Sequence, residues 1–348
     1  SKSSKTFLLT LSTSAPAQAP GSLLPPPNSV GTTSGDTHVA RRGDLGRTRW
    51  NPCGVFRSRL IPEYGGNLRN LHDLKNQVAV NLSDVRDPFS INELIKGQDY
   101  LFNLAGQTSH LDSMNDPFTD LDINAKAQLS ILEACRKNNR DIRIVFASTR
   151  QVYGKPQHLP VNEKHPLNPV DVNGINKIAG EQYHLLYNQV YGIRSSVLRL
   201  TNTYGPRMRI KDARQTFLGI WIRNLIEKKP IQVFGDGKQR RDYNYVDDVV
   251  DALIIAATKN ESAGKVYNLG APNALSLEET ARIICDLGEQ SSYVMIPFPD
   301  DRKAIDIGDF VSDYSSFSNT FGWEPKVSFE DGIERSIEFF KNELKHYL

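Results

Sequence analysis

Two side chains suited to redox chemistry on an alcohol stand near one another in the expected fold. The stretch ASTRQVYG, whose hydroxyl side chains include Thr149, follows a predicted strand, and Lys177 lies in NGINK, which opens a predicted helix. Carboxyl ends of parallel strands and the starts of the helices that follow them share one edge of a sheet, so these two side chains are expected to meet. A hydroxyl and a lysine at one place can serve the interconversion of a hydroxyl and a ketone.

Two earlier stretches end predicted strands with residues that admit a ligand. VNLSDVRD places Asp84 and Val85 at the edge of the sheet where open α/β folds bind ligands. NLAGQTSH follows the next strand, and its small Ala105 and Gly106 let a ligand approach the backbone. Each pattern alone also fits an ordinary role, Asp84 as a cap or turn residue and NLAG as a strand-to-helix turn.

Cations recur in the C-terminal half. Asn202 lies in RLTNTYGPR, Arg241 in QRRDY and Arg302 in DDRKA. The guanidinium fork suits phosphate recognition, although a single exposed arginine is usually only solvated. Phosphate binding and solvation therefore both remain open from these residues alone.

Alternating strands and helices must position these residues. Apolar runs predict strands at residues 78–82, 100–104, 142–147, 196–200 and 265–269. Amphipathic stretches predict helices at residues 91–96, 117–138, 174–190, 214–228, 246–259, 276–288 and 329–344. The alternation predicts an α/β fold with a doubly wound parallel sheet of the Rossmann type and a smaller C-terminal subdomain.

Length and composition exclude several classes of protein. The chain has 348 residues, more than one core usually organises, which favours two subdomains. Lys and Arg number 42 and Asp and Glu 40, so a nucleic-acid partner is not expected. No apolar run approaches the roughly 20 residues of a membrane-spanning helix. Three widely spaced cysteines fit neither a disulfide framework nor a metal site, and they favour a reducing, cytoplasmic setting.

Residues 1–59 differ from the rest of the chain. They carry a net charge of +6 and show neither helical nor strand periodicity, so we expect no ordered domain there. The basic start and the short FLLTL run resemble a secretory signal, and the Arg- and Ser-rich composition resembles a transit peptide. A third interpretation is that this part of the gene was translated in the wrong frame.

From about residue 60 to the end, the motifs together resemble the extended short-chain dehydrogenase/reductase family. STRQVYG, the NGINK helix start, RLTNTYGPR, GDGKQRRDYNYVDDVVDAL, YNLG and FGWEPKVSFEDGI stand at separations like those of its nucleotide-sugar epimerases and dehydratases. NLAGQTSH is similar to the corresponding stretch of CDP-tyvelose 2-epimerases, and the whole resembles UDP-glucose 4-epimerases. The resemblance implies an NAD-binding Rossmann domain over residues 60–200, to which 237–259 return, and a substrate-binding subdomain over 201–236 and 260–348.

The same resemblance implies roles for individual residues. Asp84 and Val85 would hold the adenine of NAD, and Lys177 would bind the nicotinamide ribose. Further cofactor contacts would come from Leu104, Ala105, Gly106, Thr108 and Asn124.

On the substrate side, Thr149 would hydrogen-bond the reacting sugar hydroxyl. The diphosphate of a nucleotide-diphosphate sugar would contact Asn202, Arg241 and Arg302. No metal is implied.

The first departure from the family is at the catalytic tyrosine, which stands four residues before the lysine. Here that catalytic position is Asn173. An amide has no proton that titrates near neutral pH, so it cannot act as the base. Asp171 and Tyr204 are candidate substitutes, and a non-catalytic nucleotide-sugar or dinucleotide-binding protein is the alternative to an enzyme.

The second departure is the missing Gly-x-x-Gly-x-x-Gly turn, whose helix start receives the dinucleotide pyrophosphate. Gly31, Gly35, Gly43 and Gly46 have other spacings and no apolar strand before them. Because the preceding strand is central in a doubly wound sheet, its loss predicts a gap there, which favours the wrong-frame interpretation. The acid that would distinguish NAD from NADP belongs to the same uninterpretable segment.

The residues after Thr149 bear on the reaction type. Family 4,6-dehydratases carry an Asp-Glu pair there, whereas this chain has Arg150 and Gln151, which cannot exchange protons as carboxylic acids do. We therefore expect an NAD-dependent epimerase that acts through a transient keto-sugar, or a reductase of the same family. The resemblance also implies a homodimer built on helices 117–138 and 174–190. The sequence names neither the sugar nor the nucleotide base of the substrate.

Overall fold

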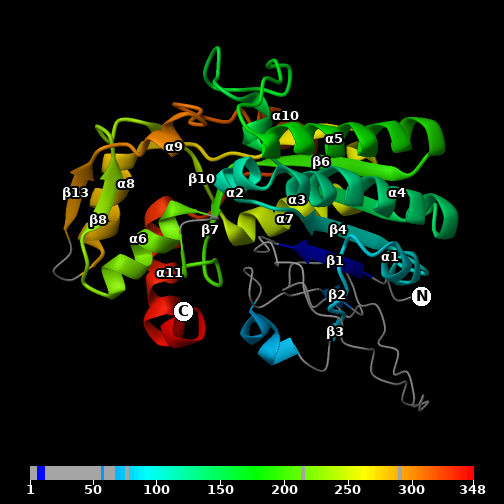
Figure 1. Cartoon of the computed structure of the whole chain (residues 1–348), viewed down its shortest axis with the longest axis horizontal. Coiled ribbons are helices and arrows are strands. Elements are labelled where there is room, and N and C mark those ends of the chain that lie inside the picture. Colours follow the sequence, from blue (N-terminus) through cyan, green and yellow to red (C-terminus); the bar gives the residue numbers. More distant parts are fainter. Residues whose placement is uncertain (1–5, 12–55, 59–66, 75–77, 213–215, 289–291) are drawn as a thin grey trace, which may run out of the picture.

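The main sheet is parallel throughout and doubly wound. The computed structural model describes residues 6–11, 56–58, 67–74, 78–212, 216–288 and 292–348. Among these, seven strands pair in the order β11-β6-β5-β4-β1-β2-β3, so the winding reverses between β1 and β4, as expected (Figure 1). Their bounds are β1 Thr6–Leu11, β2 Phe56–Ser58, β3 Val78–Val80, β4 Tyr100–Ala105, β5 Arg143–Thr149, β6 Arg194–Leu200 and β11 Val266–Asn268.

The centre of the sheet corrects the expectation for the N-terminal segment. β1 is the TFLLTL run, and it pairs with β4 over six residues, from Thr6 opposite Tyr100 to Leu11 opposite Ala105. The segment in which we expected no ordered domain therefore supplies β1 and β2 of the main sheet, and the expectation of a central gap was wrong. Strands in the middle of parallel sheets usually read as continuous apolar runs, and such a run has no alternation to detect. The glycines considered for the missing turn lie outside the described residues.

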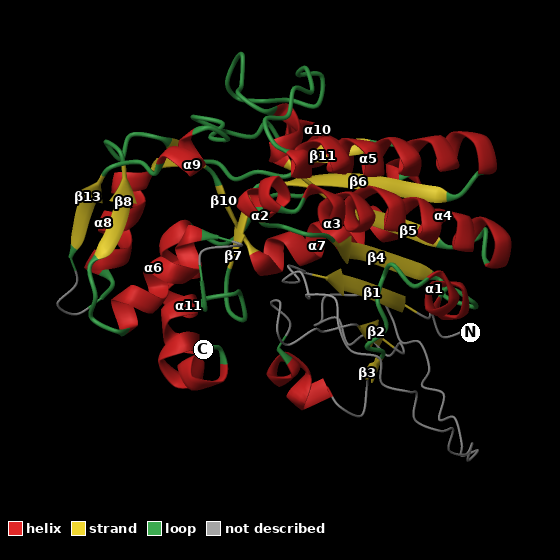
Figure 2. Cartoon of the chain, viewed as in Figure 1, coloured by secondary structure: helices red, strands yellow, loops and turns green. Residues whose placement is uncertain are grey.

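Alternate residues of β4 enter two different cores. Leu101 and Ala105 pack in the core beneath α1 (Pro88–Leu94), α4 (Ala127–Asn138) and α5 (Val172–Tyr191). Phe102 and Leu104 pack in the opposite core beneath α7 (Val246–Thr258) and α10 (Ser315–Phe321). This alternation follows from the period of two of a strand. The sheet is therefore covered on both faces (Figure 2).

Capping residues set where the site-bearing helices begin. Asp87 caps α1, with Pro88 at its first position. Asp171 caps α5 by accepting a hydrogen bond from Gly174 N, and Gly192 ends that helix in the left-handed region at φ 71°. The remaining elements of this part are the helix α2 (His110–Asn115) and the 3-10 helices Leu68–Leu74, Arg150–Tyr153 and Asn260–Ser262, while the 3-10 helix Leu344–His346 packs in the core of the smaller subdomain.

The single helix expected at 117–138 is interrupted. It consists of α3 (Pro117–Leu121), a π-helical turn at Asp122–Lys126, and α4. π-helical turns occur frequently at functional sites. This turn contains Asn124, one of the expected cofactor contacts.

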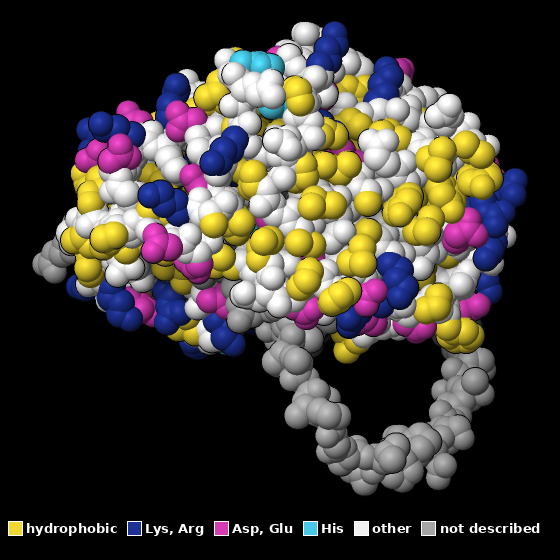
Figure 3. Space-filling view, turned by 45° about the horizontal axis from the view of Figure 1, so that its top comes forward, with side chains coloured by type: hydrophobic (Ala, Val, Ile, Leu, Met, Phe, Trp, Pro, Cys, Tyr) yellow, Lys and Arg dark blue, Asp and Glu magenta, His cyan; other side chains and the backbone are white. Residues whose placement is uncertain are grey.

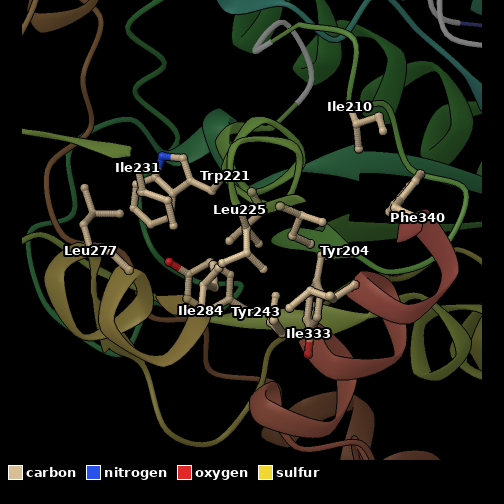
Figure 4. Packing of buried hydrophobic residues seen from close by; sticks show 14 of the residues in the cluster. Tyr204, Ile210, Trp221, Leu225, Ile231, Tyr243, Leu277, Ile284, Ile333 and Phe340 are labelled. Carbon is tan, nitrogen blue, oxygen red and sulfur yellow. The ribbon is translucent and has the colours of Figure 1, made fainter. Parts of the chain in front are cut away.

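The smaller subdomain has its own core, part of which Figure 4 shows. It is made of α6 (Phe217–Ile226), α8 (Leu277–Asp286), α11 (Phe329–Glu343), α9 (Asp300–Lys303) and three two-stranded sheets. The sheets pair β10 (Tyr243–Tyr245) with β7 (Asn202–Tyr204), β12 (Leu275–Ser276) with β9 (Arg240–Arg241), and β13 (Tyr293–Ile296) with β8 (Ile231–Phe234).

The expected boundary of this subdomain was wrong at β11 and α10, which were assigned to it. β11 pairs with β6 in the main sheet, and α10 packs in the core under α7. No helix within the described residues is both long and apolar enough to cross a bilayer.

Candidate active site

The carboxyl end of β5 holds both Thr149 and the partner of Lys177. Lys177 Nζ donates to Ala147 O at 3.0 Å and stands 4.7 Å from the centre of the Phe146 ring. Thr149 lies two residues further along the same strand, where its Oγ1 accepts from Gln151 N at 3.2 Å. The structure therefore brings the expected hydroxyl and lysine to one strand end. Burial lowers the pKa of Lys177 to about 8.

The backbone at Gly106 lies close to the end of the Lys177 side chain. A Cβ at this position would stand 2.9 Å from Lys177 Nζ and 3.0 Å from Asn124 Oδ1. Asn124 Nδ2 donates to Gln107 O at 3.1 Å, while its Oδ1 is buried without a protein partner. Three expected cofactor-site residues from three elements thus meet, and a larger side chain at position 106 would have to displace the end of Lys177 or Asn124.

Asn173 is held in a network of amides and carboxylate. Its Nδ2 donates to Gln107 O at 2.6 Å and to Asp120 Oδ2 at 3.1 Å, and its side chain is buried. Asn176 Nδ2 donates to the other oxygen of Asp120 at 2.8 Å. Position 173 therefore ties α5 to α3 and to the loop after β4, and its amide has no free donor directed at a substrate.

Asp171, a suggested substitute base, is already fully engaged. It accepts from Gly174 N at 2.7 Å and from Gln151 Nε2 at 3.0 Å, and its Oδ2 lies 2.9 Å from His110 Nδ1. Burial by itself would raise the pKa of Asp171, but the interactions with His110, Gly174 N and Gln151 outweigh it and lower the pKa. The carboxylate is therefore ionised and buried beneath other side chains.

Tyr204, the other suggested substitute, belongs to the core of the smaller subdomain (Figure 4). It is 1% exposed, and its hydroxyl donates to Ser328 O and Phe329 O at the start of α11. Burial is the main cause that raises its pKa. Its role here is packing, so the suggestion that it replaces the missing base is not supported.

Two arginines and an amide gather beside Thr149. Arg150 Nη1 donates to Asn202 Oδ1 at 3.0 Å, and Asn202 Nδ2 donates to Asp242 O at 2.9 Å. Arg241 is 7% exposed and lies 3.6 Å from Asp306. Burial, together with the nearby charge of Arg241, lowers the pKa of Arg150 to about 10. Positive charge is therefore concentrated where the resemblance places a diphosphate.

Asp242 only partly compensates that charge. Its carboxylate accepts from Ser312 N at 3.1 Å, while its Oδ1 and Arg150 Nε are buried without a protein partner. Burial raises the pKa of Asp242 to about 6, against the pull of Arg150. Arg302 lies on α9, 5.4 Å from the centre of the Phe234 ring, and none of the described contacts brings it to Arg241.

The remaining expected cofactor residues lie at the ends of β3 and β4. Asp84 accepts from Arg86 N at 2.8 Å and pairs with the Arg86 side chain, which also fits the turn role considered above. Val85 is buried in the core under α1. Leu104 and Ala105 end β4 on opposite faces, and Thr108 is half-buried in the loop that follows.

Sequence reasoning did not single out His110 and Arg150. His110 was quoted only as the last letter of NLAGQTSH, and Arg150 only as a residue that is not an acid. Asp171, two residues before the catalytic position, could have prompted a search for a histidine partner. The sequence does not identify His110 as that partner, because the two residues are 61 positions apart.

The chain is similar to proteins of one family. The profile described as the NAD dependent epimerase/dehydratase family matches residues 61–270. A putative UDP-glucose 4-epimerase of Methanocaldococcus jannaschii is 33% identical over 280 residues, which cover 80% of this chain and 88% of that protein. A CDP-paratose 2-epimerase of Salmonella typhi is 28% identical, covering 78% and 87%.

Solved structures agree with this similarity. UDP-glucose 4-epimerase of Thermotoga maritima, solved with UDP-glucose, superimposes with a TM-score of 0.75 at 26% identity, covering 84% of this chain and 92% of that one. The expected family and the Rossmann-type fold are thereby confirmed. The chain belongs to the NAD-dependent epimerase/dehydratase family.

Proposed function

We propose that this protein is an NAD-dependent nucleotide-sugar epimerase that works through a transient keto-sugar. The observation that carries the proposal is the meeting of Gly106, Asn124 and Lys177 beside the strand end that holds Thr149. A redox cofactor and a sugar hydroxyl both require this edge of the sheet. Relatives named as epimerases, at 33% and 28% identity, support the same reaction class.

The described residues fit the nicotinamide half of NAD. The backbone at Gly106 lies directly against the ends of Lys177 and Asn124, and Asn124 Oδ1 is a buried acceptor without a protein donor, which a bound ligand could satisfy. When bound, NAD supplies a carbon that accepts and returns hydride. Lys177 would hold the ribose, and Asp84 and Val85 remain the expected adenine contacts.

The nucleotide-sugar diphosphate would bind at the arginine side. Arg241 and Asn202 are held there by the smaller subdomain, and Arg150 adds a second buried cation. Phosphate oxygens suit such forks of N–H donors. Arg302 is proposed as a further contact from α9.

Turnover of a nucleotide-sugar panel in deuterated water tests the reaction type. We expect epimerised product with no deuterium on carbon, because hydride leaves and returns without meeting solvent. Arg150 and Gln151 cannot act as the acid pair that elimination needs. Deuterium at C5 of the product, or an accumulating 4-keto-6-deoxy sugar, would show that the reaction is a dehydration and not an epimerisation.

Replacement of Lys177 by alanine tests the catalytic role of this site. Lys177→Ala should lower kcat by about 10²- to 10⁴-fold if the lysine orients the ribose and tunes a proton path. Nucleotide-sugar binding, measured by calorimetry, should stay nearly the same. A variant that binds and turns over normally would remove the site from the proposal.

A non-catalytic nucleotide-sugar-binding protein is the second candidate, and Asn173 is the observation that favours it. Its amide donates both N–H groups, to Gln107 O and Asp120, and it has no proton that titrates near neutral pH. Asn173→Tyr recreates the tyrosine of the family. If the native protein turns over no nucleotide sugar and the variant does, the binding-protein candidate is correct.

We also propose that the protein is a homodimer joined through α3, α4 and α5. Apolar side chains at Ile175, Leu186 and Val190 are 56%, 49% and 58% exposed on one side of α5, and Phe118 on α3 is 78% exposed. Figure 3 shows hydrophobic side chains spread over this face. Exposed apolar area of this kind marks an interaction surface, and sedimentation measures its occupancy.

A cytoplasmic location stays a proposal from the cysteines. Within the described residues, Cys135 and Cys285 are both free thiols. Free thiols are compatible with a reducing compartment.

A further inference from the structure

The loop after β4 places an imidazole against the carboxylate that caps α5. His110 Nδ1 lies 2.9 Å from Asp171 Oδ2. The Asp171 side chain is fully buried, whereas the His110 side chain is 37% exposed. The pair thus has a fixed, buried anionic end and an imidazole that reaches the surface of the site.

The carboxylate cannot move away from the imidazole. Gly174 N and Gln151 Nε2 hold its two oxygens at 2.7 and 3.0 Å. Gln151 N is in turn bonded to Thr149 Oγ1, so the pair is fixed to the end of β5 that presents the expected substrate contact. Both partners therefore stand at the same edge as Lys177.

The negative charge beside Nδ1 favours one tautomer of His110, although the 2.9 Å contact is an ion pair and not a well-aligned hydrogen bond. A carboxylate next to Nδ1 favours a proton on that nitrogen, which leaves the lone pair on Nε2. Among the described residues, none hydrogen-bonds to Nε2. The accessible nitrogen is thus an acceptor, which is the arrangement of a histidine held by an aspartate in general-base catalysis.

We propose that His110 is the acid–base residue that replaces the family's tyrosine, with Asp171 as its positioning residue. This inference rests on the proposed function. As the C–H bond breaks and its hydride passes to the nicotinamide ring of NAD, the hydroxyl proton passes to His110 Nε2 and the C=O bond forms. The reverse transfer to the other face returns hydride to carbon and the proton to oxygen, so the reaction needs no further reactant.

Footprinting tests contact between His110 and the ligand without relying on turnover. The native chain is treated with diethyl pyrocarbonate alone, with UDP, and with UDP-glucose, UDP-N-acetylglucosamine or UDP-glucuronic acid. Mass spectrometry then gives the rate of modification of each histidine. We expect a nucleotide sugar that binds to slow modification of His110 about tenfold or more and UDP alone to protect it less. His72, which is exposed on another element, should be unaffected.

Variants separate a catalytic role from a structural one. His110→Gln should lower kcat by about 10²- to 10⁴-fold, with the Kd of the same nucleotide sugar within about threefold of native. Asp171→Asn keeps a good helix cap but loses the negative charge, so it should lower kcat at least about tenfold with the protein still folded. His72→Gln is the matched control and should leave kcat unchanged.

The outcomes distinguish the two proposals. If a nucleotide sugar binds and is turned over while His110 is unprotected, or while His110→Gln keeps its kcat, only the role of His110 is overturned. If no nucleotide sugar of the panel binds to the native chain, the proposed function fails and this inference fails with it. Protection combined with loss of kcat at unchanged Kd supports the assignment.

Discussion

Two buried arginines, Arg199 on β6 and Arg150 after β5, differ in what surrounds their charge. Arg199 bonds to both oxygens of Glu181, at 3.0 and 2.6 Å, and to Tyr153 at 2.8 Å. Arg150 has one bond to Asn202, a buried Nε without a protein partner, and Arg241 as a neighbouring cation.

The pKa directions express the same contrast. Burial opposes the charge of Arg199, but the hydrogen bonds and charge of Glu181 outweigh it and raise the pKa of Arg199. Burial lowers the pKa of Arg150 to about 10, and Arg241 adds to the decrease. A buried cation with its own carboxylate stabilises the fold, whereas one beside a second cation is suited to an incoming anion.

The largest expected effect is on the paired arginine. Arg199→Ala should lower the free energy of unfolding by about 3 to 5 kcal/mol, because it leaves the carboxylate of Glu181 buried and unpaired. Urea denaturation measures the change. Replacing both residues by leucine should recover part of it, and a loss under about 1 kcal/mol for the single variant would contradict the comparison.

Arg241→Ala should weaken nucleotide-sugar binding by about 2 to 5 kcal/mol, the usual cost of removing one partner of a buried charge pair. Calorimetry should show NAD binding almost unchanged. Arg240, the exposed residue next to Arg241, provides the matched control: Arg240→Ala should leave nucleotide-sugar binding nearly unchanged. The same measurement on Arg302→Ala tests whether α9 reaches the diphosphate, and equal loss of both ligands would make these arginines structural.

Arg150→Met removes the under-compensated charge but keeps much of the apolar stem. Nucleotide-sugar binding should weaken about 10- to 100-fold, while the free energy of unfolding stays the same or rises, since a buried charge without its own counter-ion is unfavourable. A loss of stability as large as that of Arg199→Ala would show that Arg150, like Arg199, stabilises the fold.

The smallest expected effect concerns the third buried cation. The pKa of Lys177 is about 8, below the ordinary value, so the folded chain releases this proton before the unfolded chain does. Between about pH 8 and 10 the unfolded state then binds more protons, and stability should rise with pH by about 1 to 2 kcal/mol relative to Lys177→Met. Parallel pH–stability curves for the two chains would contradict the lowered pKa.

The spacing of short motifs was sufficient to predict part of the site. Thr149 and Lys177 were placed at one strand end from STRQVYG and NGINK, and the structure joins them through Ala147 O. The pairing of Gly106 with Asn124 and Lys177 was expected only as a shared role, not as a contact. Distances between separate elements depend on packing, which motifs do not encode.

The N-terminal strand, by contrast, was not predicted from the sequence. The FLLTL run was considered only as a resemblance to a secretory signal, and the wrong-frame interpretation of its segment was favoured, because a short apolar run without alternation fits several structures. Its pairing with β4 decides between them. Hydrogen bonds to a strand about ninety residues away cannot be read from a local window.

By itself, the sequence determined the alternation of strands and helices, the doubly wound sheet, and the absence of a titratable group at Asn173. Period and residue type carry this information locally. Only the tertiary structure decided that Asp171 lies beneath His110, that Arg199 is neutralised while Arg150 is not, and that Tyr204 belongs to a core. The physical reason is that burial and charge compensation depend on which side chains, distant in the sequence, pack together, and those contacts exist only once the elements that carry them have packed.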